Sequence, residues 1–308
     1  MKTKEFKFES DDGTEIHVYK WSPDDDTAKA IIQISHGMAE HAARYERFAQ
    51  AMTKHGFIVY ANDHRGHGKT AGSLDNVGFF AKNDGWNLVV RDMFKLTLIA
   101  KNEYIGVPVV LFGHSMGSFM SREYITQHGP QLNSVILSGT GGNPGALGKI
   151  GASLAGIISL LFGKKSKSKL LNNLSFGKFN KEFEPNRTEF DWLSRDTAEV
   201  DNYVNDPYCG SVFSAGFFSD FLSGISDLFD ESKLNEIPKL LPVLLISGEK
   251  DPVGNNGKGV QETYDLYKNI GIVDVTMKLY KDDRHELLNE TNREEVFDYI
   301  AEWINSKI

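Results

Sequence analysis

The chain has 308 residues, of which 40% are hydrophobic and 25% are charged, a balance typical of a soluble globular protein with a substantial core. Its net charge of −8 argues against nucleic acid as the main partner, because a phosphate backbone would be repelled. The only cysteine, Cys209, excludes an intrachain disulfide framework and is best explained as a small buried hydrophobe. The first residues lack an apolar leader pattern, so we expect a cytoplasmic location.

The first half of the chain alternates strand patterns with helix patterns. Polar and apolar residues alternate on either side of Asp11-Asp12-Gly13, which predicts a β-hairpin. Apolar runs predict buried strands, and apolar spacing predicts helices from about Tyr45, over 84–103 and from Ser118; the strands are expected at 30–35, 57–61, 109–112 and 134–137. This order predicts parallel strands with right-handed crossovers, helices on both faces and, because of the hairpin, a mixed sheet.

The alternation stops after Gly139 and resumes beyond Pro242. We therefore expect an α/β core in two parts, 1–142 and 237–308, interrupted by a helical cap insertion over 143–236. In the second part of the core we expect strands at 243–246 and 275–280, and helices at 257–270 and 291–304. The phenylalanines between Phe213 and Phe229 make the cap apolar, and we expect them to shield an acyl chain.

One apolar run inside the expected cap, 150–162, is uncharged. A membrane-spanning helix needs about 20 apolar residues, so this run is too short and is expected to cover a pocket or lie at an interface. The lysines that follow, Lys164, Lys165, Lys167 and Lys169, are either a solvated loop or a surface for transient contact with anionic lipid.

Ser115 lies in the sequence Gly113-His-Ser-Met-Gly117, between a predicted strand and a predicted helix. This G-x-S-x-G pattern is typical of a nucleophile elbow, in which the two glycines let the strand and the helix approach closely. The serine then takes a strained backbone conformation and projects its hydroxyl, while the helix N-terminus offers free N–H groups to an anion. The pattern predicts Ser115 as a catalytic nucleophile.

A serine hydroxyl needs a base and a third group that holds the base in the correct tautomer. His285 follows the last predicted strand and Asp251 follows the strand before it, so both belong at the same sheet edge as Ser115. Among the carboxylates, Glu249, Asp282 and Asp283 compete with Asp251. We prefer Asp251, because Asp282 and Asp283 are too close along the chain to His285 to support its ring, and Glu249 falls early in its turn.

An oxyanion intermediate requires N–H donors that are already in place. The backbone N–H of Met116, directly after the nucleophile, is expected to be one donor, and that of Met38, in the loop after the strand 30–35, is expected to be the second. In a further polar loop, Asp63, His64 and Arg65 are expected to form a network beneath the site.

The histidines and glycines of the chain do not form a metal or nucleotide motif. His36, Glu40 and His41 lack the H-E-x-x-H spacing, and the sequence ending in Gly66-His-Gly-Lys-Thr70 has Asp63 where a phosphate loop needs its first glycine. We therefore expect no cofactor and no catalytic metal.

Five segments of the chain resemble the serine aminopeptidase-like branch of the α/β-hydrolases, which includes monoacylglycerol lipases and bacterial lysophospholipases. They are H-G-M-A-E-H-A-A-R-Y (36–45), N-D-H-R-G-H-G-K-T (62–70), G-H-S-M-G (113–117), G-E-K-D-P (248–252) and R-H-E-L-L-N-E (284–290). The resemblance implies the α/β-hydrolase fold, with a mostly parallel eight-stranded sheet, helices on both faces and a mobile helical cap over an acyl-binding tunnel. It also implies the catalytic residues Ser115, Asp251 and His285 and the oxyanion donors Met38 and Met116.

From the residues and the resemblance together, we expect a serine hydrolase that cleaves esters of lipid-like substrates, of monoacylglycerol or lysophospholipid type, through an acyl-enzyme. An aminopeptidase of the same family is an alternative, because a cap carboxylate could bind an α-amine, and Glu182, Glu184 and Glu189 are candidates. A binding protein that has kept the hydrolase fold without turnover is a second alternative, disfavoured by the intact set of Ser115, Asp251 and His285.

Overall fold

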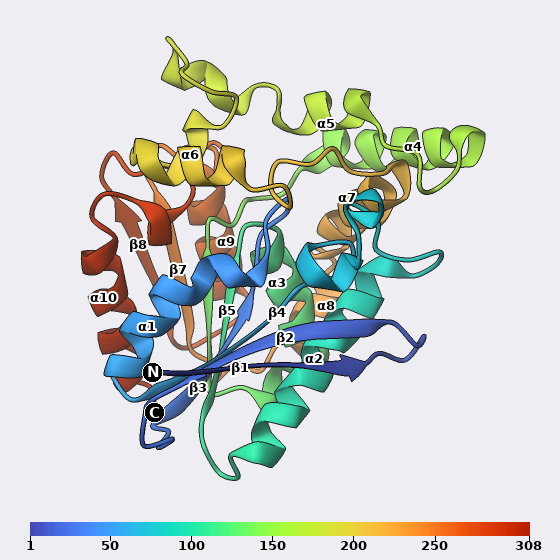
Figure 1. The fold of residues 1–308 in the computed structure, drawn as a ribbon. Helices are drawn as coiled ribbons and strands as arrows, with labels where there is room; N and C mark the ends of the chain where they lie inside the picture. The colour runs from blue at the N-terminus through green and yellow to red at the C-terminus, as the bar shows by residue number, and fades with distance from the viewer.

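The central sheet of the computed structural model, which describes residues 1–308, has eight strands in the order β1-β2-β4-β3-β5-β6-β7-β8 (Figure 1). β2 pairs antiparallel with both β1 and β4, and the other five pairings are parallel, so the sheet is mixed as predicted. The strands are β1 Lys2–Glu9, β2 Glu15–Ser22, β3 Ala30–Ser35, β4 Phe57–Asn62, β5 Val109–His114, β6 Ser134–Ser138, β7 Val243–Gly248 and β8 Val275–Tyr280.

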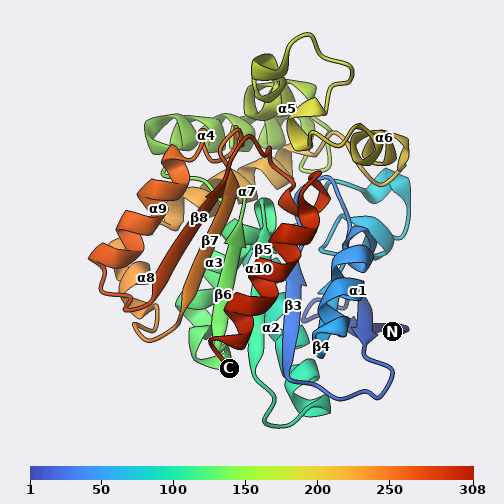
Figure 2. The ribbon, with the colours of Figure 1, turned by 90° about the vertical axis from the view of Figure 1, so that its left-hand side faces the viewer.

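Helices cover both faces of this sheet. Every residue of β3, β4, β5, β6 and β7 is buried, which explains why these strands appear in the sequence as continuous apolar runs. α1 (Glu46–Lys54) and α10 (Arg293–Asn305) pack against each other and against one face (Figure 2). α2 (Gly85–Glu103), α3 (Met116–His128) and α9 (Lys258–Asn269) cover the other.

Two helices begin two residues away from the start that the sequence predicts. α3 begins at Met116 instead of Ser118, so the helix starts directly after the serine of the G-x-S-x-G pattern. α10 begins at Arg293 instead of Thr291, because Glu290 and Thr291 belong to the preceding loop, where the Thr291 N–H is bound by the Glu290 carboxylate at 3.1 Å.

Five helices lie between β6 and β7, in the interval where the strand rhythm of the sequence stops. They are α4 (Gly145–Phe162), α5 (Lys169–Phe176), α6 (Thr197–Asn205), α7 (Ala215–Asp227) and α8 (Glu231–Glu236). α4, α5 and α6 stand above the carboxyl ends of the parallel strands, whereas α7 and α8 pack beside α2 and α3 (Figures 1 and 2). The division of the chain at 142/143 and 236/237 stays a prediction.

The phenylalanines of α7 do not have the place expected for them. Phe217, Phe218 and Phe221 are buried in the same hydrophobic cluster as Phe80 and Trp86, and none of the three lines the large cavity above the sheet. The Phe217 ring packs edge to face on Phe218, stacks on Phe221 and is tilted against Phe80, with the Phe80 and Phe217 centroids 4.6 Å apart. The phenylalanine series therefore joins the insertion to the core instead of shielding a ligand.

α4 is exposed along most of its length. It is the one helix that is long and apolar enough, by length and composition, to cross a membrane, with 18 residues, a mean hydropathy of 1.7 and 17% of its residues buried. It packs mainly against α7.

Candidate active site

Ser115 stands in the turn between β5 and α3 with a strained backbone, at φ 52° and ψ −119°. This conformation is held by the close approach of strand and helix. A Cβ atom at Gly117 would come within 1.9 Å of the Ser35 carbonyl oxygen, and one at Gly113 within 2.5 Å of the Gly117 carbonyl oxygen. Only glycine fits at either position, which is the reason for the G-x-S-x-G spacing.

His285 and Asp251 come from the loops that follow β8 and β7, and the structure brings them together. The His285 Nδ1 lies 2.9 Å from the Asp251 Oδ1, and both side chains are buried. The Asp251 carboxylate also accepts hydrogen bonds from the Val253 N–H at 2.9 Å and the Ser247 hydroxyl at 3.1 Å. With Asp251 accepting from Nδ1, the Nε2 of the neutral ring carries the free lone pair, as a general base requires.

Burial disfavours charge on both members of this pair, but their mutual attraction prevails. Burial alone would lower the pKa of His285, yet the neighbouring Asp251 carboxylate raises it above 6.5. Burial alone would raise the pKa of Asp251, yet the imidazolium and the three hydrogen bonds lower it. Asp251 is therefore ionised at neutral pH and orients His285.

Ser115 and His285 line one cavity of about 460 Å³ above the carboxyl ends of the strands. Met38, His114 and Trp192 share its wall, and the Trp192 and His285 ring centroids are 5.0 Å apart. Met116 is buried directly after Ser115. The structure thus places Ser115, His285 and Met38 around one space, with Asp251 behind His285.

The other carboxylates considered as partners of His285 point elsewhere. Asp283 is fully buried but pairs with Arg195, from the segment between α5 and α6. Burial raises the pKa of Asp283 to about 6. Glu249 and Asp282 are exposed and make no contact with His285. Of the four candidates, only Asp251 is hydrogen-bonded to the ring.

The loop that carries Met38 is anchored by a buried charge cluster. The Glu40 Oε1 accepts the Gly37 N–H at 2.6 Å, and its second oxygen accepts from the Arg44 guanidinium at 2.7 Å. Arg44 also donates two hydrogen bonds, each of 2.7 Å, to the Glu286 carboxylate beside His285. Burial opposes charge on Glu40 and Glu286, but Arg44 holds the pKa of both carboxylates below its usual value. One guanidinium therefore connects the Met38 loop to the His285 loop.

Beneath this loop lies a buried histidine with a defined tautomer. The His36 Nε2 accepts the His64 N–H at 2.9 Å, so its Nδ1 carries the proton and donates to the Gly37 carbonyl at 2.7 Å. Burial lowers the pKa of His36 to about 3, so the ring is neutral. His36 is a structural support of the loop and not a titrating group at neutral pH.

The prediction that Asp63, His64 and Arg65 form one polar network is wrong, because each of the three side chains is bound to different partners. Asp63 accepts the N–H groups of Ala42 and Lys69, and His64 binds the Ser35 hydroxyl at 2.9 Å. Arg65 pairs with Asp92 at 2.6 Å and with Asp12 at 2.7 Å on the outer side.

Several residues at the site have no role that was predicted from the sequence. Glu40, Arg44 and Glu286 lie within the motifs around 36–45 and 284–290, and the i,i+4 spacing of Glu40 and Arg44 is a signal that could have identified them. Trp192 and Tyr203 lie in the part of the chain without strand rhythm. There, no periodic pattern relates a residue to the sheet edge, so the sequence offers no signal for them.

The strand order and the serine turn between β5 and α3 together define the α/β-hydrolase class. Within this class, residues 26–292 match the family described as Serine aminopeptidase, S33, and the chain belongs to it. This confirms the resemblance derived from the five sequence segments.

Known proteins are similar along nearly the whole chain. A monoacylglycerol lipase of Mycolicibacterium smegmatis is 27% identical over 99% of this chain and 98% of its own length. A monoglyceride lipase of Rattus norvegicus is 30% identical over 96% of this chain and 89% of its own. Among solved structures, a thermostable carboxyl esterase from Bacillus coagulans in complex with glycerol superposes with a TM-score of 0.92 and 28% identity, over 100% of this chain and 99% of that one.

Proposed function

We propose that the protein is a serine ester hydrolase that cleaves monoesters of fatty acids, of monoacylglycerol type, through an acyl-enzyme. The observation that carries this proposal is the arrangement around the cavity of about 460 Å³, where Ser115 with its strained backbone and the Asp251-bound His285 meet. The similar proteins named as monoacylglycerol lipases and a carboxyl esterase support the ester as the reacting group.

In the proposed mechanism, the Ser115 hydroxyl attacks the ester carbonyl while the His285 Nε2 takes its proton. Asp251 stabilises the imidazolium that forms. The N–H groups of Met38 and Met116 hold the oxyanion of the tetrahedral intermediate. His285 then protonates the leaving alcohol, and a water molecule repeats the sequence on the acyl-enzyme and releases the fatty acid.

The lining of the cavity supports a substrate with an apolar part and a small polar part. The apolar side chains Met38, Phe176, Trp192 and Val212 are suited to an acyl chain. The amides and hydroxyls of other lining residues are suited to hydroxyl groups of an alcohol such as glycerol; they are Asn172, Asn173, Asn186, Thr188 and Ser211.

Hydrolysis of p-nitrophenyl esters from acetyl to palmitoyl tests this function. We expect Ser115→Ala to lower kcat by about 10⁴-fold or more, since the nucleophile is lost, and an optimum of chain length set by the cavity. Ser73→Ala is the matched control, because Ser73 is exposed and lies in a turn away from the cavity. Equal activity of Ser115→Ala and the wild type would reject Ser115 as the nucleophile.

An aminopeptidase is a second candidate, because one of the three cap carboxylates lines the cavity. Glu189 does so, whereas Glu182 is bound to the Asn256 amide at 2.9 Å and lies outside. A panel of aminoacyl and fatty-acyl esters separates the two functions. If the protein is an ester hydrolase of lipids, Glu189→Gln should change the turnover of fatty-acyl esters by no more than about twofold. If the wild type prefers aminoacyl esters and Glu189→Gln abolishes this preference, the protein is an aminopeptidase.

We further propose transient contact with a lipid surface through α4. Leu147, Ile150, Ile157 and Leu161 are each more than half exposed and recur at helical spacing along α4, and Leu160 and Phe162 on either side of Leu161 are 70% exposed or more. The lysines of 164–169 follow directly and can attract anionic headgroups.

Sedimentation with vesicles tests this contact. We expect the wild type to bind anionic phospholipid vesicles more strongly than neutral ones, and the double variant Leu160→Glu/Leu161→Glu to lose binding. Ile105→Glu is the control, since Ile105 is 89% exposed in the loop before β5, away from α4. Equal loss in the control, or no binding by the wild type, would contradict the proposal.

A further inference from the structure

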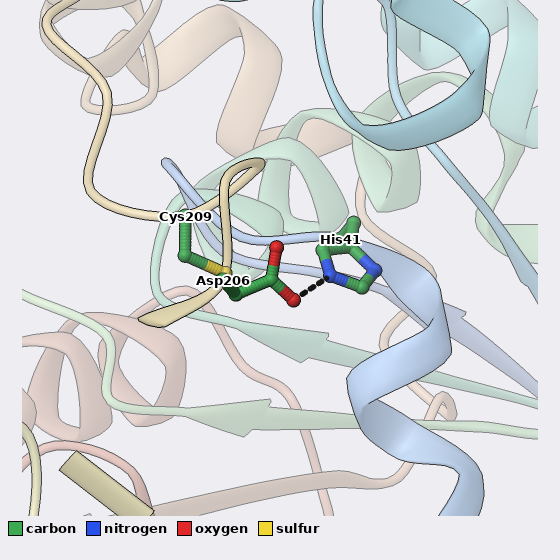
Figure 3. A group of neighbouring side chains, drawn as sticks. All are labelled: His41, Asp206 and Cys209. Carbon is green, nitrogen blue, oxygen red and sulfur yellow. Dashed lines mark hydrogen bonds and ion pairs between the residues drawn. The ribbon is translucent and has the colours of Figure 1, made fainter. Parts of the chain in front are cut away.

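Three side chains that can ligate a metal meet outside the cavity of Ser115: His41, Asp206 and Cys209 (Figure 3). His41 directly precedes the turn Ala42–Tyr45 and follows the loop of Met38, whereas the other two lie in the turn after α6. Their ligand atoms all lie within 4.8 Å of one another, and the His41 Nε2 is 2.9 Å from the Asp206 Oδ2.

The turn that carries two of these ligands is already fixed. The Cys209 N–H donates to the Asp206 carbonyl at 3.0 Å, and the Tyr208 N–H donates to the Asp206 Oδ1 at 2.8 Å. The second carboxylate oxygen is therefore left facing His41 (Figure 3). The next residue, Gly210, donates its N–H to the Ala39 carbonyl at 3.0 Å, which ties this turn to the loop of Met38. Such orientation of ligands by neighbouring hydrogen bonds is what metal sites require.

We propose that His41, Asp206 and Cys209 bind one Zn²⁺-class divalent cation, with water as the fourth ligand. Nitrogen, sulfur and carboxylate oxygen are the ligand types that zinc takes in proteins. A thiolate, a carboxylate and a neutral imidazole carry two negative charges, which match the cation and leave no uncompensated charge in the partly buried cluster. In a tetrahedral site the ligand atoms lie about 3.3–3.7 Å apart, so a pair separated by as much as 4.8 Å must close by about 1 Å when the cation binds.

A path for the cation leads from solvent. His41 and Asp206 also line a separate cavity of about 450 Å³. The exposed Glu46 carboxylate in its wall can attract cations, whereas Glu5 there is paired with Lys69. Because a cysteine binds a metal ion as the thiolate, binding at Cys209 releases the thiol proton to the buffer.

The site joins the loop of Met38 to the turn after α6. His41 is three residues beyond Met38, and Tyr203 on α6 donates its hydroxyl to the Ala39 carbonyl at 2.9 Å. A cation that bridges His41 to Asp206 and Cys209 takes the place of the direct hydrogen bond between His41 and Asp206 as the third connection between these segments, without contact to Ser115. The site is independent of the proposed hydrolase function. The sequence shows no sign of it, because His41 lies 165 residues from Asp206 and no ligand spacing links them.

Titration of the full chain with Co²⁺ tests the proposal, because a cobalt–thiolate bond gives a charge-transfer absorption in the near ultraviolet. Cys209 is the only cysteine, so this absorption can come from no other residue. We expect it to saturate at one Co²⁺ per chain, to be displaced by Zn²⁺, and to be absent in Cys209→Ala. Calorimetry in two buffers of different ionisation enthalpy should register one released proton.

The variants His41→Gln and Asp206→Asn should weaken Zn²⁺ binding at least about tenfold. His55→Gln should leave it unchanged, since His55 is half-exposed at the C-terminal end of α1, near Asp298 of α10. Retained hydrolysis of a short ester shows that each variant is folded. Absence of the charge-transfer absorption in the wild type, or the same affinity in His41→Gln, would overturn the proposal, even if Co²⁺ binds elsewhere.

Discussion

His285 is a buried imidazole whose surroundings favour its protonated form. Burial works against the charge, but the Asp251 carboxylate at 2.9 Å outweighs it, so the pKa lies above the ordinary value of 6.5. The charged form of the pair therefore stabilises the fold fully below about pH 6.5, and this contribution is lost as the pH rises through the raised pKa. The role of general base that we propose for His285 needs the neutral ring, so folding and the proposed catalysis prefer opposite protonation states of this residue.

This residue predicts the pH dependence of hydrolysis. Because His285 acts only when neutral, we expect kcat/KM to fall as the pH is lowered through its pKa, with a midpoint above about 6.5. The measurement is kcat/KM for a short p-nitrophenyl ester against pH, with the fold checked by circular dichroism. A profile without an acid limb over this range would show that His285 is not the base.

Asp251→Asn tests the orienting acid. Without the Asp251 carboxylate, burial lowers the pKa of His285 and only the weaker attraction of Glu286 and Glu40 opposes it, so we expect the acid limb to move to lower pH. The rate at the optimum should fall by about 10⁴-fold, because the ring is no longer held in the correct tautomer. Asp283→Asn is the control, since Asp283 pairs with Arg195 and not with His285. If both variants shift the acid limb of the kcat/KM profile equally, Asp251 is not the residue that orients His285.

At the scale of single residues, the site residues that follow strands can be predicted from the sequence, whereas those from the segment between β6 and β7 cannot. Ser115, Asp251 and His285 each lie just beyond a strand that is visible as an apolar run, so their common edge could be inferred. Trp192 and Glu189 line the same cavity but lie in an aperiodic segment. Their position depends on how α4, α5 and α6 fold over the strand ends, which no local pattern specifies.

The element that places the serine is the turn from β5 into α3, and its tight packing can be measured. An alanine at Gly117 would bring its Cβ within 1.9 Å of the Ser35 carbonyl oxygen, where backbone must move. We expect Gly117→Ala to lower the free energy of unfolding by about 1–3 kcal/mol or more and to abolish hydrolysis.

The matched control is Gly156→Ala in α4. There the nearest atom to the new Cβ, the Ser219 Oγ, is at an ordinary 3.8 Å, and the residue lies inside a helix. Alanine should therefore raise the free energy of unfolding by about 0.4–1 kcal/mol. Denaturation in urea measures the free energy of unfolding of both variants. A Gly117→Ala protein as stable as the wild type would contradict the close approach of strand and helix.

The strands and helices themselves were predictable to within a few residues, because buried runs and helical spacing are local signals. The hairpin, the parallel strands after it and the helices around them all form as the sequence indicates. The role of the phenylalanines in α7 was not predictable. An apolar helix face has the same pattern whether it covers a ligand or a protein core, and here it packs on Phe80 and Trp86.

At the scale of the whole molecule, the carboxyl ends of the parallel strands of a mixed sheet face helices from the segment between β6 and β7. The cavity lies at this junction, with Ser115 and His285 from the sheet side and Phe176 and Trp192 from the insertion. The exposed helix α4 belongs to the same segment between β6 and β7. The proposed lipid contact and the proposed ester hydrolysis therefore both involve this segment.

Covalent labelling with an alkyl fluorophosphonate tests the central claim most directly, because this reagent forms a lasting adduct with an activated serine. We predict one adduct per chain, mapped to Ser115 by mass spectrometry, lost in Ser115→Ala and slowed by excess monoacylglycerol, with ester hydrolysis falling in proportion to labelling. An adduct on a different residue, or full hydrolysis after complete labelling of Ser115, would contradict the account.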